Sequence, residues 1–599
     1  MTAPTTTRSG AATAVDADEA ALVLRVLSAM LREDVVGLRT AGTPVELPDG
    51  RWLRLAPGDP AGALLLPVAD DGFQCARAAR LPLLRREADG TELTGVQEIV
   101  DALRALADPA DRGGFDDFAK ECRQTLATMR LHTATRDEVD TSLTARYGTD
   151  PAHWTGLAAG LAHDTLAARL DHPVYPTARG RSGLDESQLR AYAPEFHPRF
   201  ALRWLALPRE AVTVPGGPEA LPAYWPTPAD LGLGHLSDSH LALPVHPLSL
   251  GVPLREALRE QGLTDSAVLS QRPYLDVVPT LSMRTVALAD DPAFHLKVPL
   301  ATATLGLRNR RTIKPRTLRN GAVSQRTLQS VISREERFAD TVLLADESVY
   351  AHADHELLAV LCRGYPTALD ADAVVPMAAL LSRAPGGRLV LGHLADRFYG
   401  GDPLALLDAA LALLFDWQTT LFGYGIALES HQQNISLVFH DGTDGPRLRL
   451  LLKDNDGPRL NMVRLRERLG ADAPGRDDFT DPRIIADGDR ALTDLFTTIT
   501  VHLCAGAYAF GLAEHGLAPL DVLLRLVRDR LAEAVERLGT GPGEPGAVLR
   551  AHVLDAPDLP VKAMLTAGTL LSKERSGAAD INKHYTAGPN YLVRTASSR

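Results

Sequence analysis

The hydrophobic periodicity of this chain changes along its length, and that change limits the class of fold it can adopt. From Glu19 to about Leu170, Leu/Ala/Arg stretches recur at helical spacing. Strand-like alternation follows between Leu269 and Leu300, and after Pro403 apolar helices alternate with strands. The 599 residues suffice for about three to five domains at ~100 to 200 residues each. We therefore predict an α+β protein of several domains.

The boundaries between the predicted domains follow shifts in composition. The first residues are rich in Thr, Ala and Gly, which favours a flexible tail. A short β insert is predicted near Val45 to Leu66, and the proline-dense connector from Pro208 to Asp230 cannot be a helix. The predicted units are a tail (1–18), a helical domain (19–165), a β-rich second domain (166–375) and a mixed α/β third domain (376–599).

The overall charge and the cysteines exclude several classes of protein. With 63 Lys and Arg against 75 Asp and Glu, the net charge of -12 argues against broad binding to nucleic acid or to anionic membranes. The N-terminus lacks the continuous apolar segment of a secretory signal. The four cysteines lie far apart without a CxxC pair, as is typical of free thiols in a reducing compartment. We expect a cytoplasmic protein.

The segment SMRTVALADDPAFHLKVPL predicts a β-hairpin with its turn at Ala289 to Ala293. A turn centred near Asp291 places Thr285 opposite Lys297. Ser282, Arg284 and Thr285 would then add donors of the kind that hold phosphate groups.

A second hairpin is predicted from Ile435 to Lys453, because two β-rich runs flank the turn-rich DGTDGP. Antiparallel pairing would bring its two outer ends together, with Glu429, His431, Gln433 and Asn434 at one end and Asp454, Asn455 and Asp456 at the other. Carboxylates with an Asn amide predict an oxygen-rich Mg²⁺ site, and His431 could contact phosphate or handle a proton. The alternative is a set of polar residues that only cap the hairpin.

A basic run extends from Leu296 to Ser333 without a single acidic residue. Arg forks match the geometry of phosphate and carboxylate groups, so the run predicts an anion site. A solvated helix face is the competing interpretation, and a nucleic-acid groove is disfavoured because the run lacks aromatic residues. The cations of the run are Lys297, Arg308, Arg310, Arg311, Lys314, Arg316, Arg319 and Arg326.

The segment HPVYPTARGRSG (172–183) is a third candidate. Its prolines favour an extended backbone, on which Arg179 and Arg181 would point the same way and clamp a carboxylate-rich substrate. A proline-rich connector with two solvated arginines is the alternative.

Together these segments resemble the NRPS-independent siderophore synthetases, the family of the aerobactin, achromobactin and desferrioxamine synthetases. The resemblance covers about residues 150 to 595. Tyr175 stands where a second His is usual, Arg179 where Lys is usual, and Lys453 replaces an Arg. PVKAMLTAGTL near Lys562 resembles the segment that faces the acyl acceptor. The matching motif positions are His172, Pro173, Pro176, Arg181, Gly183, Ser282, Arg284, Thr285, Lys297, Glu429, His431, Gln433, Asn434 and Asp454.

The resemblance implies a cupped hand of helical thumb, β-rich fingers and mixed α/β palm, usually dimeric. It implies ATP-dependent adenylation of a carboxylate, often citrate, followed by attack of an amine, hydroxylamine or alcohol. The C-terminal region of the family is sometimes labelled ferric-reductase-like, but this sequence has no Cys cluster for an iron–sulfur centre.

The resemblance also implies roles for individual residues. It implies catalytic roles for His431, Arg284, Lys297 and Arg311. It implies ATP binding by Ser282, Arg284, Thr285, Lys297, His431, Gln433, Asn434 and Asp454. It implies Mg²⁺ ligands at Glu429, Asp454 and Asp456, and substrate binding by His172, Arg179, Arg181, Arg308, Arg310 and Lys562.

Two alternatives from other classes remain open. His431, Asn434 and Asp454 also echo the catalytic loop of a small-molecule kinase. A non-enzymatic siderophore- or citrate-binding protein would need only the arginine cluster. The three hypotheses differ in product, since the ligase yields AMP and pyrophosphate, the kinase yields ADP, and the binding protein yields neither.

Overall fold

The computed structural model describes residues 16–55, 62–443, 445–577 and 584–593. Most of the predicted tail lies outside these ranges. Its last residues do not belong to a tail, because helix α1 (Ala17–Glu33) begins at Ala17 with Asp16 accepting from the backbone N–H groups of Asp18 and Glu19.

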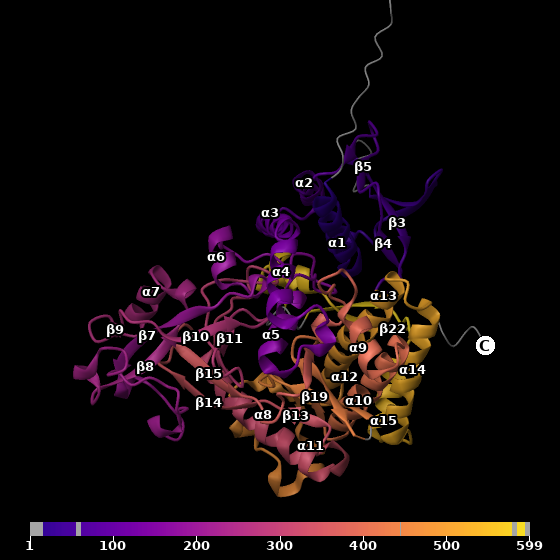
Figure 1. Ribbon diagram of the computed structural model, residues 1–599. Coiled ribbons are helices and arrows are strands. Elements are labelled where there is room, and N and C mark those ends of the chain that lie inside the picture. The colour runs from indigo at the N-terminus through magenta and orange to yellow at the C-terminus, as the bar shows by residue number, and fades with distance from the viewer. Residues whose placement is uncertain (1–15, 56–61, 444, 578–583, 594–599) are drawn as a thin grey trace, which may run out of the picture.

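An N-terminal unit combines three helices with a sheet (Figure 1). The helices are α1, α2 (Val96–Leu106) and α3 (Arg112–Ala134). The predicted β insert is longer than expected and holds six strands, in which β4 pairs with β3 beside the order β1-β2-β3-β5-β6. The later strands are short and rich in Arg, so alternation did not reveal them. The strands are β1 (Thr43–Leu47), β2 (Gly50–Leu55), β3 (Leu64–Asp70), β4 (Arg77–Ala79), β5 (Leu84–Arg86) and β6 (Glu92–Leu93).

An eight-stranded sheet forms the second large element, in the order β14-β15-β12-β11-β10-β7-β8 with β9 paired to β7. It contains the first predicted hairpin, and the register pairs Thr285 with Lys297, as predicted. Apolar residues of one face, among them Leu205, Val277 and Leu296, form a separate core. The strands are β7 (Phe200–Pro208), β8 (His240–Val245), β9 (Val268–Leu269), β10 (Tyr274–Pro279), β11 (Thr285–Leu288), β12 (Phe294–Lys297), β14 (Asp346–His352) and β15 (Ala359–Gly364).

A four-stranded sheet, in the order β13-β19-β18-β16, contains the second predicted hairpin. Strands β18 (Ile435–Gly442) and β19 (Gly445–Leu452) pair from Ile435 opposite Leu452 up to the turn. The outer strands β13 (Val342–Leu344) and β16 (Ala373–Pro376) come from the part of the chain before residue 377. This sheet therefore joins the second and third predicted units.

Helices cover these sheets and connect them. Helix α5 (Gly156–Ala168) packs against β16, and α8 (Pro315–Arg334) packs against β14. Further helices are α4 (Arg136–Tyr147), α6 (Glu186–Tyr192), α7 (Val252–Glu260), α9 (Val390–Phe398) and α11 (Met462–Leu469). Three short strands, β17 (Ile426–Ala427), β20 (Arg459–Asn461) and β21 (Ile485–Ala486), form a small sheet of their own.

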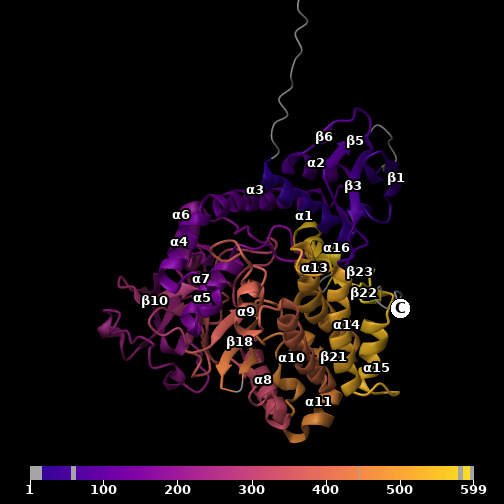
Figure 2. The same ribbon diagram turned by 45° about the vertical axis from the view of Figure 1, so that its right-hand side comes forward.

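The C-terminal part is mainly helical and lies beside the N-terminal unit (Figure 2). Helix α10 (Pro403–Gly423) packs against α14 (Leu520–Arg537). A long helical stretch begins at Arg490 and runs to Glu514 as α12 (Arg490–Leu495), a π-helical stretch (Phe496–Gly506) and α13 (Ala507–Glu514). Helices α15 (Pro545–Leu549) and α16 (Lys573–Ser576) and the pair β22 (Asp558–Lys562) and β23 (Tyr585–Pro589) complete it.

Within the described ranges, two helices are long and apolar enough to cross a membrane by length and composition alone. They are α10 and the helix at 490–514, whose most apolar windows are 61% and 89% buried inside the protein. They are core helices of the fold.

Two glutamates, the buried Glu33 and the half-buried Glu121, connect the N-terminal helices to the C-terminal segment. Glu33 of α1 accepts from the backbone N–H groups of Leu565 (3.0 Å) and Thr566 (2.7 Å), at the start of the π-helical turn 566–570. Glu121 of α3 accepts from the Thr569 hydroxyl (2.6 Å) at the same turn. It also accepts from the backbone N–H of Leu307 at 3.0 Å. Burial raises the pKa of both carboxyl groups.

Candidate active site

The two predicted hairpins meet through a buried ion pair. Lys297 ends strand β12, and its Nζ lies 2.7 Å from Asp454 Oδ1, just beyond strand β19. Asp456 Oδ2 lies 3.6 Å from the same nitrogen. Lys297 is only 5% exposed. Two motifs 157 residues apart in the sequence therefore belong to one site.

Sequence reasoning missed two further charged residues at this ion pair. Arg363 of β15 donates through Nη2 to Asp454 Oδ1 at 2.7 Å and through Nε to Glu347 Oε1 at 2.5 Å. Glu347 belongs to β14, and both side chains are fully buried. One signal was available: Arg363 is the only charged residue in the otherwise apolar strand AVLCRG. A charge in a buried strand requires a partner.

Opposing effects set the ionisation of Asp454. Its burial favours the neutral acid, but the charges of Lys297 and Arg363 outweigh burial and hold the pKa of Asp454 well below its usual value. Burial by itself would lower the pKa of Arg363, but Asp454 and Glu347 raise it. Asp454 and Arg363 are therefore both charged at neutral pH.

The structure brings together the two outer ends of the second hairpin. The backbone N–H of Lys453 donates to the Asn434 carbonyl at 3.1 Å, and Asn434 Nδ2 donates to the Glu429 carbonyl at 3.2 Å. A Cβ added to Gly457 would lie 3.7 Å from Glu429 Oε2, so this carboxylate lies beside the segment that follows Asp454.

The arrangement does not form a complete metal site. Asp454 Oδ1 already accepts from two cationic groups, and within the described ranges no three His, Cys, Asp or Glu side chains gather closely enough to hold a metal ion. Glu429 faces Lys562 at 3.9 Å. The metal assignment of Glu429, Asp454 and Asp456 stays a prediction, and no chemical step is derived through it.

The basic run divides into inward and outward cations. Arg311 lies half-buried, and its Nη2 donates to the Ser282 carbonyl at 3.4 Å. Arg284 donates through Nη1 to the Thr312 carbonyl at 2.6 Å. Burial and then the charge of Arg284 lower the pKa of Arg311 to about 9, so it remains a cation at neutral pH. The outward cations are Arg308, Arg310, Lys314, Arg316, Arg319 and Arg326, which are exposed.

The six outward cations agree with the solvated-face interpretation, whereas the anion site stays a prediction for the inward ones. Arg308, although exposed, donates through Nη1 to the carbonyl of Ala567 at 3.3 Å. Ser282 Oγ accepts from the backbone N–H of Thr285 at 3.1 Å and so shapes the turn before β11. The Thr285 hydroxyl is buried and finds no hydrogen-bond partner among the described residues.

The expectation that Arg179 and Arg181 point the same way is wrong. Arg179 donates through Nε and Nη2 to the two oxygens of Asp171, both at 2.9 Å. Arg181 is buried and donates through Nη2 to Glu195 Oε1 at 2.7 Å. Each arginine has its own carboxylate, and the backbone is not extended as expected: residues 176–179 form a turn, and the N–H of Gly180 donates to the Thr177 carbonyl at 3.1 Å.

His172 and His431 both use the ring nitrogen Nδ1 to accept hydrogen bonds from the backbone. His172 Nδ1 accepts from the backbone N–H groups of Val174 (3.2 Å) and Tyr175 (3.1 Å), and His431 Nδ1 accepts from that of Gln433 (3.3 Å). Burial lowers the pKa of His172 to about 3 and that of His431 to about 4. Both rings are therefore neutral at pH 7, with their proton on Nε2.

Lys562 lies in strand β22 and is 6% exposed, so it is not a surface lysine on a helix. Its charge lowers the pKa of both His172 and His431, which places all three groups in one neighbourhood. The Tyr175 hydroxyl, by contrast, donates to Glu121 Oε2 at 3.1 Å and supports the neighbouring segments.

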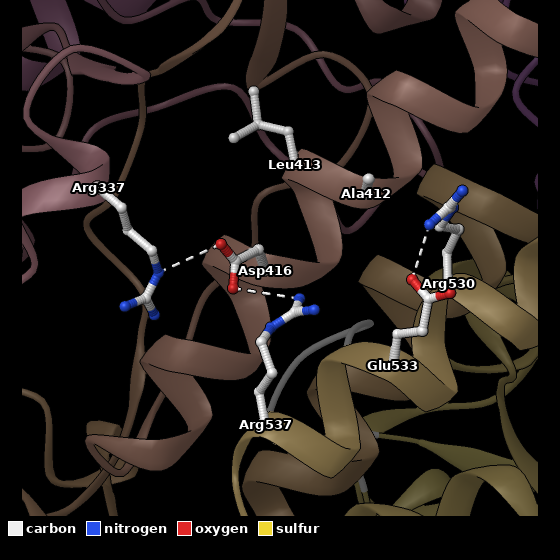
Figure 3. A pocket seen from close by; sticks show the side chains of 7 residues that line it. All are labelled: Arg337, Ala412, Leu413, Asp416, Arg530, Glu533 and Arg537. Atoms are coloured by element: carbon white, nitrogen blue, oxygen red, sulfur yellow. Dashed lines mark hydrogen bonds and ion pairs between the residues drawn. The ribbon is translucent and has the colours of Figure 1, made fainter.

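A cavity of about 660 Å³ lies elsewhere, between α10 and α14 (Figure 3). None of the predicted site residues lines it. Its three arginines are neutralised, since Asp416 pairs with Arg337 and Arg537, and Arg530 pairs with Glu533 and Asp408. This hollow therefore offers no uncompensated charge to an anion.

Comparison with known proteins identifies two regions. The sequence model of the IucA / IucC family matches residues 163–382. That of the ferric iron reductase FhuF-like transporters matches residues 405–577. The first region contains the hairpin 285–297, and the second contains His431 and Asp454.

Relatives and solved structures cover most of the chain. Staphyloferrin B synthase of Staphylococcus aureus is 25% identical over 465 residues, which is 72% of this chain and 76% of that protein. The petrobactin biosynthesis protein AsbB of Bacillus anthracis has the same fold, with a TM-score of 0.74 over 97% of both chains at 18% identity. The ATP-bound aerobactin synthetase IucA of Klebsiella pneumoniae gives a TM-score of 0.70 at 19% identity, covering 96% of this chain and 99% of that chain.

Proposed function

Because the chain belongs to the IucA/IucC family of siderophore synthetases, we propose that it is an ATP-dependent ligase that joins a carboxylate to a nucleophile. The carboxylate is citrate or a citryl or other dicarboxylate derivative. The nucleophile is an amine, a hydroxylamine or an alcohol, and the product is an amide or an ester. We further propose that the three units form the thumb, fingers and palm of a cupped hand, and that the enzyme acts in the cytoplasm as a homodimer.

The contact between Lys297 and Asp454 carries this proposal. It joins the first hairpin to the polar end of the second hairpin, which offers His431. Arg284 lies at the start of the first hairpin, and Arg311 of the basic run reaches the Ser282 carbonyl beside it. A triphosphate is the ligand class that such a concentration of buried cations and N–H donors would stabilise.

The first half-reaction is adenylation. The substrate carboxylate attacks the α-phosphorus of ATP, a new C–O–P linkage forms, and pyrophosphate leaves with the electrons of the broken P–O bond. Negative charge accumulates around phosphorus in this step. Lys297, Arg284 and Arg311 would neutralise it, because fixed cations in a water-poor site act without reorganisation.

The two histidines would act as hydrogen-bond donors. With Nδ1 accepting from the backbone and the ring neutral, Nε2–H is the group left to meet a ligand. Each could donate to a phosphate or carboxylate oxygen. This arrangement favours phosphate contact over proton acceptance for His431.

The second half-reaction is acyl transfer. The nucleophile attacks the acyl carbon, AMP leaves, and the nucleophile loses a proton. We assign Lys562 to the acceptor side, beside Glu429 and His172, and we assign Arg308 and Arg310 to the edge of the substrate site. ATP enters as its magnesium complex, with Mg²⁺ as part of the substrate.

The test is a product assay with purified protein. ATP and a panel of carboxylic acids, with citrate first, are incubated with and without amines and alcohols. Carboxylate-dependent release of pyrophosphate and AMP, with a condensed product in the mass spectrum, is the expected result. ADP formation without pyrophosphate would instead indicate the kinase alternative. Tight citrate binding without nucleotide turnover would indicate the non-enzymatic binding protein.

A further inference from the structure

The buried pair Glu347–Arg363 is the strongest feature that the proposed chemistry does not yet use. A single oxygen, Glu347 Oε1, accepts both from Arg363 Nε (2.5 Å) and from the backbone N–H of Asp454 (3.0 Å). Asp454 has a φ of 56°, a left-handed conformation that is unusual for a residue with a side chain. Glu347 therefore fixes both the guanidinium and a strained backbone position.

The sheet explains how these groups reach one place. Strands β12 and β15 are antiparallel, with Lys297 opposite Leu361 and His295 opposite Arg363. Lys297 and Arg363 are thus diagonal neighbours on one face, and both reach Asp454 Oδ1 at 2.7 Å. The register of β14 shifts between Asp346 and Val349, and this irregularity contains Glu347. Such irregularities re-aim side chains beside functional sites.

The charges around Asp454 indicate what Glu347 and Arg363 can do. Arg363 and Lys297 both donate to the same oxygen of Asp454, Oδ1. If the phosphates of ATP share the ammonium of Lys297, the negative charge of Asp454 would repel them unless another cation compensates it. Arg363 is that cation, and Glu347 keeps it from turning toward the phosphates itself.

We infer that Glu347 and Arg363 are positioning residues for ATP, acting through Asp454 on Lys297. The inference rests on the proposed function only in that the ligand of Lys297 is ATP. It assigns a role to two residues outside the predicted motifs, and neither needs to touch the substrate.

The experiment measures the affinity for ATP by calorimetric titration. It also measures kcat and the KM values for ATP and for the carboxylate separately in an assay of pyrophosphate release. The variants are Glu347→Gln, Arg363→Met and Arg363→Lys. Asp372→Asn is the matched control, because Asp372 is an equally buried carboxylate bonded to Arg449 and His440. The control lies away from the site, because its partner His440 stands in β18 six residues after Asn434, about 20 Å at ~3.3 Å per residue.

We expect Glu347→Gln and Arg363→Met to weaken ATP binding and raise KM for ATP about tenfold or more. In these two variants the KM for the carboxylate should change less than twofold. In the control variant, ATP affinity and KM for ATP should also change less than twofold. Arg363→Lys keeps the charge but cannot reach Glu347 and Asp454 with one planar fork, so its loss should be intermediate. In a Lys297→Ala background, Glu347→Gln should weaken ATP binding less than twofold further, because its effect passes through Lys297.

Several results would overturn the inference. They are unchanged ATP affinity in Glu347→Gln, an equal loss in Asp372→Asn, or a full additional loss in the Lys297→Ala background. If Arg363→Met does not fold, Glu347→Gln and Arg363→Lys decide the question. A wild-type protein that binds ATP but releases no pyrophosphate would refute the ligase proposal and leave the binding test of the positioning pair intact.

Discussion

At the scale of single residues, Asp454 connects most of the charges of the site. Its side chain accepts from Lys297 and Arg363, and its backbone donates to Glu347. The distances of 2.7 Å are those of charge-assisted hydrogen bonds. A change of charge at this position therefore alters the orientation of both cations.

Asp454→Asn should lower carboxylate-dependent pyrophosphate release about a hundredfold, because Lys297 loses the partner that orients it. The free energy of unfolding should fall by about 1 to 3 kcal/mol, since two buried cations lose a charged acceptor. Steady-state kinetics and urea unfolding measure the two effects. Near-normal pyrophosphate release in a folded variant would contradict the assignment.

Some residues could not be predicted because their partners lie far away in the sequence. Arg363 is 91 residues from Asp454, and Glu347 is 107 residues from it. No local pattern reports a contact of that kind. The orientation of Arg179 and Arg181 was wrong for another reason: Asp171 and Glu195 lie only 8 and 14 residues from them, and the expectation of an extended backbone ignored both carboxylates.

At the scale of elements, both hairpins were predictable because each contains its two strands and its turn in one short segment. Alternation and turn residues determine such a unit locally. The sheets that contain the hairpins were not predictable, since β13 and β16 join β18 and β19 from far upstream. The extra strands of the N-terminal sheet were missed because three-residue strands carry too little alternation.

Strand β22 ends at Lys562, beside Glu429. Lys562→Met should leave carboxylate-dependent ATP–pyrophosphate exchange within about twofold while slowing product formation tenfold or more, because only acyl transfer uses the acceptor site. Lys120→Met, on the exposed surface of α3, is the control. Equal losses in both half-reactions would place Lys562 on the acid or the adenylate instead.

Helix α3 supports two loops through Glu121. Glu121→Gln should reduce the free energy of unfolding by about 2 to 4 kcal/mol, because four hydrogen bonds of about 1 kcal/mol each lose a charged acceptor. Hydrogen exchange at 304–309 and 566–570 should accelerate. Asp117→Asn, an exposed carboxylate on the same helix, should change neither. Unchanged exchange at both loops would show that Glu121 does not hold them.

At the scale of the whole molecule, buried neutral histidines make stability depend on pH. The pKa values lowered to between about 2 and about 4 belong to His132, His163, His172, His197, His246, His431 and His502. Burial is the main cause in each case. The unfolded chain binds protons at these positions near pH 6.5 while the folded chain does not, so stability is complete above that pH and falls as the pH decreases.

Each such histidine should cost about 1 kcal/mol between pH 6.5 and pH 5.5. The buried glutamates, with raised pKa values, act in the opposite sense but are fewer. Urea unfolding at pH 7.5 and at pH 5.5 should therefore differ by several kcal/mol. His132→Phe, at a ring without hydrogen-bond partners among the described residues, should reduce the difference by about 1 kcal/mol. Equal stability at both pH values would contradict the buried neutral state.

The contacts of Glu33 also have a consequence for how the protein is made. Its carboxylate accepts from residues 532 and 533 positions later. At ~5 to 20 residues per second, a ribosome needs roughly half a minute to two minutes to add that length of chain. Throughout that time the nascent N-terminal unit carries a carboxylate whose partners do not yet exist. Helix α1 is among the first elements synthesised, but it reaches its final environment only when the segment after Lys562 has emerged.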